Sequence, residues 1–486
     1  MNFRQAFRSS FILFVAIVMS TCATNPVTGK KDFVTVTETQ EIAMGKEYDP
    51  QIVEMYGLYQ DDRIQAFINE KGQEMARISH RPNLQYEFKV MDSPIINAFA
   101  VPGGYVYFTR GILAHFNNEA EFAGVLGHEI GHVAARHSVK QISKQQLGQV
   151  GILIGMIISP EFQQFSQVAQ AGLQLLSLKN SRGDETESDE LGVEYSTRIG
   201  YDAKYMAGFF KTLGRLQTQA GVTIPDFMSS HPNPANRFEN VEALTKEWQA
   251  KTQGPYNVNR NQYLRMIDGL IYGEDPNQGY VDNNTFYHPL MKFSFPVPSN
   301  WQLQNSPSQV QMASDDGKAM IVFTFAEGSN LSNAVSNAVT KFNLTETSRT
   351  NIYVNGFNAI NLKAVQNNTT DPTKSLQLNS YFIDFDGSIF VFHGIAGQSD
   401  FPSYQNSMVQ AMNGFRKLTD PSKINVTPER ISIQTVPATA TVRQTFQRLG
   451  VPSSRMEELA ILNSLELTDT VEKGSLIKVL RNWLNK

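Results

Sequence analysis

The 486-residue sequence predicts an α+β protein built from several domains. Within residues 22–252, apolar residues recur at helical spacing in the segment from Asn118 to Ile142, and short alternating strand patterns recur in residues 257–423. Residues 428–486 fit a small β-α-α-β unit, and the length alone also predicts about three domains. With 18% charged residues, a net charge of −4 and no basic run, the composition indicates a globular body and argues against nucleic-acid binding.

Residues 1–21 have the features of a signal peptide. After two arginines, the apolar run Phe11–Met19 is too short to span a membrane but fits the apolar core of a secretion signal. Met19-Ser20-Thr21-Cys22 then resembles a bacterial lipobox, and Cys22 is the only cysteine, so no intramolecular disulfide can form. We therefore expect lipidation at Cys22, which holds the mature chain to a membrane by acyl chains. The alternative is a signal peptide followed by an incidental cysteine.

The motif His128-Glu129-Ile130-Gly131-His132 lies in a segment, Asn118 to Ile142, that is expected to be a helix. Histidines four residues apart project from one face of a helix, where two imidazoles can bind one Zn²⁺. Glu129 then lies beside the open position of the metal, as the general base of peptide-bond hydrolysis requires. The alternative for so short a motif is a surface helix with two solvated histidines.

Glycines recur in this predicted helix. Asn118 and Glu121 fit a capping box at its start. Gly124, Gly127 and Gly131 each lower helix propensity by about 1 kcal/mol relative to alanine. Glycines in a segment that otherwise favours a helix predict the close approach of another backbone, as a crowded site needs.

A third metal ligand is expected in the acidic segment Ser181–Gly192. Glu185 and Asp189 are four residues apart. On a second helix, Glu185 can complete a His-His-Glu site while Asp189 accepts a hydrogen bond from a ligand imidazole. The alternative is a solvated acidic helix start. His137 is the other candidate ligand, but on a continuous helix it lies about 140° from His132, so we expect it to face elsewhere and to be structural.

Three segments together resemble one enzyme family. His128–His137 reads HEIGHVAARH, Ser181–Asp189 reads SRGDETESD and Asn97–Gly111 reads NAFAVPGGYVYFTRG. In this order they are similar to zinc metallopeptidase family forty-eight, the HtpX, BepA and CAAX prenyl protease type, over about residues 22 to 250. The resemblance implies a mainly helical HExxH zincin-type domain with a small β-hairpin or sheet at the cleft. It also implies one Zn²⁺ per chain with ligands His128, His132 and Glu185, general base Glu129, and Asp189 behind a ligand histidine.

Two further segments match the family. Phe99–Thr109 reads as a hairpin with a Pro-Gly-Gly turn. The resemblance implies that its strand pairs with an extended substrate, which gives substrate-binding residues Asn97, Ala98, Phe99 and Ala100. The alternative is an ordinary hairpin, and Ser188, where the family usually has alanine, is a mild departure.

The segment His231 to Arg237 resembles the HP…R segment that follows the ligand glutamate in the family. For His231 this implies either stabilisation of the tetrahedral intermediate or a fourth metal ligand that keeps the enzyme latent. For Arg237 it implies stabilisation of negative charge or orientation of a carboxylate. Both residues are therefore catalytic candidates.

Residues 257–423 predict an α+β domain without a catalytic constellation. Strands are expected at Met320–Phe325, Asn351–Leu362, Ser375–Phe385 and Ser388–Ile395, and helices at Asn330–Thr340 and Tyr404–Arg416. The segment resembles the middle module of lipoprotein members of the family, with a fold similar to the photosystem PsbP proteins. We expect a substrate-docking or spacer role.

Residues 428–486 resemble a degenerate LysM module. Ala438-Thr439-Ala440-Thr441 replaces the usual Gly-Asp-Thr, which weakens the expectation of glycan binding. Peptidoglycan or an envelope protein remains a possible partner of this module.

The resemblance implies a zinc-dependent endopeptidase that cuts misfolded or unassembled cell-envelope proteins. The segment after Cys22 resembles the mature start of lipoprotein members, and Ala23, rather than aspartate, resembles an outer-membrane address in the periplasm of a Gram-negative bacterium. Two alternatives stay open. One is a hydrolase of peptidoglycan stem peptides, and the other is a chaperone-like or scaffold lipoprotein with little turnover.

Overall fold

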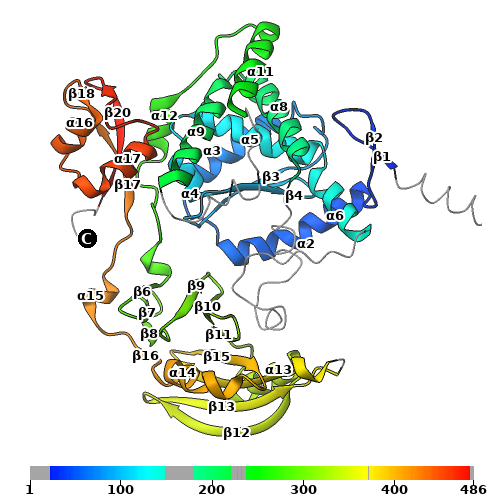
Figure 1. Cartoon of the computed structure of the whole chain (residues 1–486), viewed down its shortest axis with the longest axis vertical. Coiled ribbons are helices and arrows are strands. Elements are labelled where there is room, and N and C mark those ends of the chain that lie inside the picture. Colours follow the sequence, from blue (N-terminus) through cyan, green and yellow to red (C-terminus); the bar gives the residue numbers. More distant parts are fainter. Residues whose placement is uncertain are drawn as a thin grey trace, which may run out of the picture.

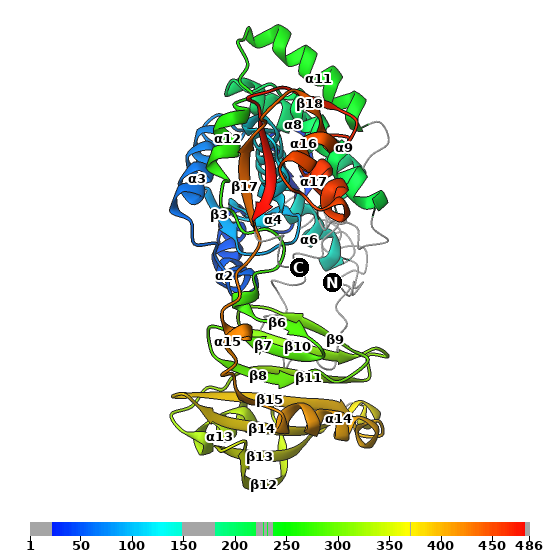
Figure 2. The same cartoon turned by 90° about the vertical axis from the view of Figure 1, so that its left-hand side faces the viewer.

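The computed structural model describes residues 22–147, 180–219, 227, 231, 237–369 and 371–481. The predicted signal peptide lies outside these residues. The chain forms an upper body, which contains the HExxH segment, and a lower body rich in strands (Figures 1 and 2). The C-terminal module lies on one side of the upper body. Within the described ranges, no helix combines the length and apolarity needed to cross a membrane.

Helices surround a small sheet in the upper body (Figure 1). The helices are α2 (Glu38–Tyr56), α3 (Asp62–Ala76), α4 (Arg110–His115), α5 (Glu119–Ala134), α6 (His137–Leu147), α8 (Arg182–Arg198), α9 (Lys204–Gln219), α11 (Arg237–Thr252) and α12 (Arg260–Met266). The sheet has the order β3-β5-β4, formed by β3 (Glu87–Met91), β5 (Tyr105–Thr109) and β4 (Ala98–Val101). β4 and β5 form the predicted antiparallel hairpin, with positive φ at Gly103 and Gly104 in its turn, and β4 lies at the sheet edge.

The helix that carries HExxH is shorter than the sequence predicted. Asn118 caps α5 by accepting a hydrogen bond from the Glu121 backbone amide, as expected. The Glu121 carboxylate accepts from the backbone amide of Asn117 and from the side-chain amide of Asn118, not from the Asn118 backbone amide that a capping box uses. The prediction of one helix to Ile142 is wrong. The chain leaves helical geometry at Arg136, whose φ is 58°, and α6 begins at the next residue.

The lower body contains two antiparallel sheets. The larger has the order β12-β13-β14-β15-β11-β10-β9, with β9 (Trp301–Asn305), β10 (Gln309–Ser314), β11 (Ala319–Phe325), β12 (Thr345–Val354), β13 (Phe357–Gln366), β14 (Leu376–Phe385) and β15 (Ser388–Gly397). The smaller contains β16 (Arg416–Lys417), β8 (Phe293–Pro296), β7 (Thr285–His288) and β6 (Tyr280–Asp282). Helices α13 (Leu331–Lys341) and α14 (Phe401–Asn413) complete the lower body.

The expected strand Asn351–Leu362 is wrong as a single strand. Asn355 and Gly356 both adopt positive φ and turn the chain, so β12 and β13 form a hairpin there. An Asn-Gly pair is a strong hairpin signal because both residues tolerate this conformation. The lower body keeps two apolar clusters of its own, which are separate from the core of the upper body.

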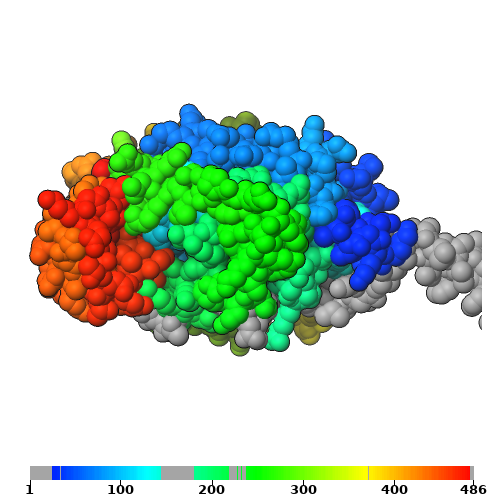
Figure 3. Space-filling view, turned by 90° about the horizontal axis from the view of Figure 1, so that it is seen from above, coloured from blue at the N-terminus to red at the C-terminus, as the bar shows by residue number. Residues whose placement is uncertain are grey.

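The C-terminal module has the predicted β-α-α-β order. Strand β17 (Arg430–Thr435) pairs with β20 (Leu476–Arg481), and helices α16 (Val442–Arg448) and α17 (Met456–Leu462) lie between them in sequence. Its buried apolar residues belong to the same cluster as those of the upper body. Seen from above, the module packs directly on this body, at the end opposite the strands β1 (Cys22–Thr24) and β2 (Lys31–Phe33) (Figure 3).

A buried lysine fastens this module to the upper body. The ammonium of Lys478 in β20 is fully buried and donates hydrogen bonds to the carbonyls of Ala114 and Phe116, at 2.8 and 2.9 Å. These carbonyls belong to the end of α4, where helical carbonyls lack helical partners. The Asn117 amide group also donates to Leu462 O and Ser464 Oγ. The C-terminal module therefore holds the turn that leads into α5.

The chain passes into the lower body and returns from it at one place. Gly269 N donates to Ile431 O, Ile431 N donates to Leu270 O, and Tyr272 N donates to Glu429 O, at 2.8 to 2.9 Å. The chain that leads into the lower body thus pairs with the chain that returns from it. The lower body is an insertion between two paired segments.

We predict that replacing residues 279–424 with a short Gly-Ser linker leaves the upper body folded, because the paired segments stay intact and no shared apolar core is cut. Circular dichroism should show one cooperative melting transition within a few degrees of that of the full chain. The comparison is a chain that ends at residue 427. It lacks apolar surface from the upper-body core and the Lys478 donor, so we expect it to aggregate or melt far lower. Equal melting of this truncated chain would show that the C-terminal module contributes nothing to the core.

Candidate metal centre

Glycines let α5 and α8 pack backbone to backbone. A Cβ atom on Gly127 would lie 2.9 Å from the Gly192 carbonyl oxygen, and one on Gly192 would lie 3.0 Å from the Gly124 carbonyl oxygen. A Cβ atom on Gly131 would lie 3.1 Å from Leu191 Cβ. A side chain at Gly127 would therefore force the backbones apart, and one at Gly192 or Gly131 would fit only if its neighbour moved by a few tenths of an ångström. The close backbone approach predicted from the glycines is confirmed.

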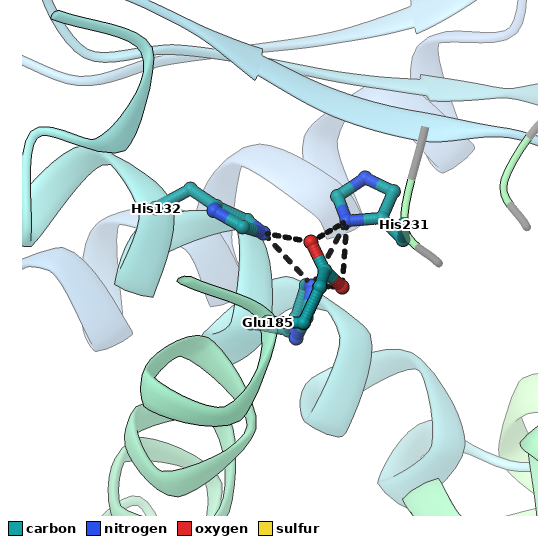
Figure 4. A group of neighbouring side chains, drawn as sticks. His132, Glu185 and His231 are labelled. Carbon is teal, nitrogen blue, oxygen red and sulfur yellow. Dashed lines mark hydrogen bonds and ion pairs between the residues drawn. The ribbon is translucent and has the colours of Figure 1, made fainter. Parts of the chain in front are cut away.

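This packing brings two histidines of α5 against a glutamate of α8. The Nε2 atoms of His128 and His132 are 3.0 Å apart, and each lies 3.4 Å from a carboxylate oxygen of Glu185. His231 completes the group, with Nδ1 3.1 Å from His128 Nε2 and 3.1 Å from Glu185 Oε1. The four side chains are buried, and His132, Glu185 and His231 converge from three segments in Figure 4.

The geometry of the four side chains fits a zinc ion. Ligand atoms around a tetrahedral zinc, with metal–nitrogen distances of about 2.0–2.1 Å, are about 3.3 Å apart. The distances between the facing atoms here are 3.0 to 3.4 Å. Two imidazole lone pairs and a carboxylate that face one another also repel unless a cation lies between them. Imidazole and carboxylate donors in this number are typical of zinc sites.

The outer nitrogen of His128 faces a carboxylate. Its Nδ1 lies 2.9 Å from Asp189 Oδ1, on the α8 turn that follows Glu185. Arg237 binds the same carboxylate with two hydrogen bonds, from Nε at 2.7 Å and from Nη2 at 2.6 Å, and its guanidinium stacks 3.8 Å above the Phe210 ring. Of the two functions expected for Arg237, this arrangement favours orientation of a carboxylate.

The outer nitrogen of His132 faces His137, which the sequence did not predict. The two Nδ1 atoms are 2.8 Å apart, and His137 is fully buried. The expectation that His137 faces elsewhere is wrong because the chain breaks at Arg136 and does not continue as a helix. The last histidine of HEIGHVAARH was the only available signal. A left-handed arginine is rare, so no local pattern indicated the break.

Glu129 lies beside the cluster without a hydrogen-bond partner. The side chain is fully buried, and neither carboxylate oxygen has a partner among the described residues. Among the described residues, the His231 imidazole lies close to it, with Nε2 3.6 Å from Glu129 Oε1. Burial raises the pKa of Glu129. A buried carboxylate without partners is costly, and such groups concentrate at functional sites.

His231 is held in place by Phe227. The two rings stack with centroids 4.6 Å apart, and the His231 amide donates to the Phe227 carbonyl at 2.8 Å. The Phe227 amide in turn donates to the Ile96 carbonyl, just before β4. The segment that carries His231 therefore contacts the chain leading into the edge strand.

The predicted substrate-binding residues lie on and just before β4. Asn97 O accepts a hydrogen bond from Thr109 N, so the backbone of alternate residues from Asn97 faces the neighbouring strand β5. The backbone groups of Ala98 and Ala100 then point away from β5, toward the edge of the sheet, where Ala98 is fully buried and Ala100 is half-buried. The Phe99 ring packs on Tyr107, with centroids 4.9 Å apart.

A buried ion-pair cluster that the sequence analysis missed holds the end of α5. Glu41 of α2 accepts from Arg81 at 2.7 Å and from Arg136 at 2.8 Å. Arg81 also donates to the Val133 carbonyl of α5, and Arg136 donates to the Val36 carbonyl. These partners are far apart in sequence, so no local pattern indicates them. Cys22 lies at the start of β1, whose backbone pairs with β2.

Comparison with known proteins finds a sequence family that is similar to the region of this site. The model of Peptidase family M48 matches residues 62–245. The beta-barrel assembly-enhancing protease of Yersinia pestis is 28% identical over 260 residues, which cover 52% of this chain and 53% of that protein. The mitochondrial metalloendopeptidase OMA1 of Arabidopsis thaliana is 32% identical over 203 residues, 40% of each chain. The chain thus spans about half, or less, of the length of these curated relatives.

The likeness to solved structures is weaker. Cyanobacterial PsbP from Synechocystis aligns with 29% of this chain and 91% of its own, at a TM-score of 0.22 and 10% identity. A TM-score this low assigns no fold. The PsbP-like fold of the middle domain stays a prediction.

We predict that Gly127→Ala lowers both the melting temperature and the zinc affinity, because the new methyl meets the Gly192 carbonyl and pushes α8 away from α5. Overpacking of this kind costs about 1–3 kcal/mol. Gly208→Ala in α9 is the matched control, since a Cβ atom there meets nothing within 4 Å. This change should be neutral or slightly stabilising. Thermal melting and zinc titration of both variants make the comparison, and equal behaviour would exclude the backbone contact as the constraint on the site.

Proposed function

We propose that this protein is a zinc-dependent endopeptidase, a proposal that the match of residues 62–245 to the model of Peptidase family M48 supports. The observation that carries the proposal is a buried carboxylate without partners, Glu129, beside a cluster of two histidines and a glutamate whose spacing suits zinc. The curated relatives are named as a protease and a metalloendopeptidase, which supports the same activity.

The proposed ligands are His128, His132 and Glu185. Zinc held there supplies a Lewis acid for the scissile carbonyl and lowers the pKa of water. Asp189, held by Arg237, accepts the Nδ1 proton of His128 and so keeps Nε2 free to act as a ligand.

Glu129 is the proposed general base. It takes a proton from the water that attacks the scissile carbonyl carbon, and it gives this proton to the amide nitrogen as the C–N bond breaks. The water adds across the bond, and the carboxylate ends unprotonated. The absence of any other hydrogen-bond partner among the described residues leaves both oxygens of Glu129 available for these transfers.

The edge strand β4 is the proposed substrate-binding element. The outward backbone groups of the half-buried Ala100 can pair with an extended polypeptide, whereas those of the fully buried Ala98 must first be uncovered. Pairing of this kind is recognition that tolerates many sequences. A peptide must be unfolded to pair in this way. The geometry therefore favours unfolded or unassembled proteins as substrates.

For His231 we favour the role of a fourth ligand that keeps the site latent. Its Nδ1 lies as close to His128 Nε2 and Glu185 Oε1 as the other ligand atoms lie to one another. In this position the imidazole fills the coordination place that a substrate carbonyl or water needs. Displacement of the His231 side chain from the cluster would open the site.

We further propose that the enzyme acts in the envelope of a Gram-negative bacterium, held at the outer membrane by a lipid on Cys22. The lipobox-like Met19–Cys22 segment supports this, and the relative in Yersinia pestis is named for beta-barrel assembly. Misfolded or unassembled envelope proteins are then the substrates. The C-terminal module has the strand and helix order of a LysM module, so peptidoglycan or an envelope protein is a possible partner.

The two other functions are less favoured. A hydrolase of peptidoglycan stem peptides rests on the C-terminal module alone, and the apolar core of that module is shared with the upper body. A scaffold with little turnover has no use for a buried carboxylate without partners, which destabilises the fold. Both alternatives lack a feature of the site that favours them.

We predict that Glu129→Gln lowers cleavage of unfolded casein by at least about a hundredfold while the protein still binds about one zinc per chain, because the amide cannot accept the proton. Metal analysis and gel-based cleavage of wild type and variant, side by side, make the test. Loss of zinc in the variant would instead make Glu129 a metal ligand. A wild type without zinc would overturn the proposed function.

We predict that His231→Ala raises turnover. If at least half of the molecules hold His231 against the cluster, the gain is about twofold or more. The double variant with Glu129→Gln must be inactive and serves as the control. A fall of about a hundredfold would assign His231 to the oxyanion instead, and unchanged turnover would remove it from the site.

A further inference from the structure

The two histidines of the HExxH motif have different outer partners. His128 turns its Nδ1 to the Asp189 carboxylate, 2.9 Å away. His132 turns its Nδ1 to another imidazole, that of His137, at 2.8 Å. A ligand histidine needs an acceptor on its outer nitrogen so that the proton stays there and the inner nitrogen keeps its lone pair. His137 must therefore accept a hydrogen bond if His132 is to bind a metal.

Glu187 makes His137 an acceptor. The Nε2 atom of His137 lies 3.0 Å from Glu187 Oε2 and 3.6 Å from Asp184 Oδ1. An ionised carboxylate only accepts, so Nε2 carries the hydrogen and donates it. In the neutral ring Nδ1 is then unprotonated, and it accepts from His132. The Ser188 hydroxyl, 3.3 Å from the same Nδ1, is a second and longer contact.

The break between α5 and α6 puts His137 in this place. On a continuous helix His137 would lie about 140° around the axis from His132. Arg136 instead takes a left-handed conformation and is fixed there by hydrogen bonds to Glu41 and to the Val36 carbonyl. The fold thus stabilises a rare backbone conformation that turns His137 toward His132.

His137 is not itself a fourth ligand. Its Nδ1 contacts the Nδ1 of His132, whereas the Nε2 of His132 faces the cluster. The group of side chains whose ligand atoms lie within 4.8 Å of one another contains His231 but not His137. His137 therefore acts on the site only through His132.

We propose that His137 and Glu187 are positioning residues for His132, which hold its ring and tautomer so that Nε2 is presented to the metal. The proposal rests on the proposed function, which supplies the metal. Packing alone would require only the volume of His137, whereas positioning requires its acceptor nitrogen.

The test compares His137→Leu with His137→Asn in the full-length protein. Leucine keeps the volume but accepts no hydrogen bond, and the asparagine oxygen can take the place of Nδ1 as acceptor. Zinc affinity is measured by competition with a chromophoric chelator, and the visible spectrum of the cobalt-loaded protein reports ligand geometry. Loss of an outer partner raises the zinc Kd by about 10–100-fold. We expect this rise, with an altered cobalt spectrum, for leucine and a Kd within a few-fold of wild type for asparagine.

A wild-type Kd in His137→Leu, or equal losses in both variants, would overturn the proposal while leaving the proposed function intact. Failure of the wild type to bind zinc would overturn the proposed function, and the positioning role with it. If His137→Leu does not fold, Glu187→Leu and Glu187→Gln carry the same comparison at a partly exposed position. Glutamine keeps an acceptor for His137 Nε2 and should bind zinc like wild type, and leucine should bind it more weakly. Equal zinc affinities in this pair would also overturn the proposal.

Discussion

The site depends on one contact, the backbone packing of α5 on α8. Side chains at Gly127, Gly131 and Gly192 would each meet the opposite helix, so glycine at these positions sets how closely the two helices approach. At this separation, the Glu185 carboxylate lies beside Nε2 of His128 and the Asp189 carboxylate lies beside its Nδ1. Glycine weakens each helix by about 1 kcal/mol relative to alanine. The chain accepts this loss of local stability to bring the ligands together.

The second constraint is charge buried behind the ligands. Asp189 with Arg237 lies behind His128, and His137 with Glu187 lies behind His132. In each case the outer partner fixes an imidazole that local helix geometry alone would leave free to rotate. Buried charges are costly unless each is paired, and in both groups every carboxylate has a donor. The ion pairs therefore contribute less to net stability than to the orientation of the histidine rings.

The C-terminal module and the lower body differ in how they are attached to the upper body. The C-terminal module shares the core of the upper body and caps the end of α4 through Lys478, so it supports the turn that leads into α5. The lower body has its own apolar clusters. It is joined to the upper body by two segments, residues 269–272 and 429–431, which form hydrogen bonds with each other. It can therefore differ in orientation or in partner without disturbing the metal centre.

Periodic and local features of this protein could be predicted from its sequence. The HExxH spacing, the cap at Asn118, the glycines of α5 and the hairpin before Thr109 each depend on neighbours within a few residues. They are therefore visible as local sequence patterns. The four-residue spacing of Glu185 and Asp189 is another such pattern. Boundaries failed where one residue took an unusual conformation: Arg136 ended α5 early, and Asn355 split a predicted strand.

Only the tertiary structure decided which distant groups meet. Glu41 reaches Arg136 across 95 positions, and Lys478 reaches Ala114 across 364. No spacing rule links such residues, because burial and charge pairing act through space after the helices have packed. For the same reason the sequence indicated the proposed ligands His128 and His132, whereas only the fold showed that the imidazole of His137 faces His132.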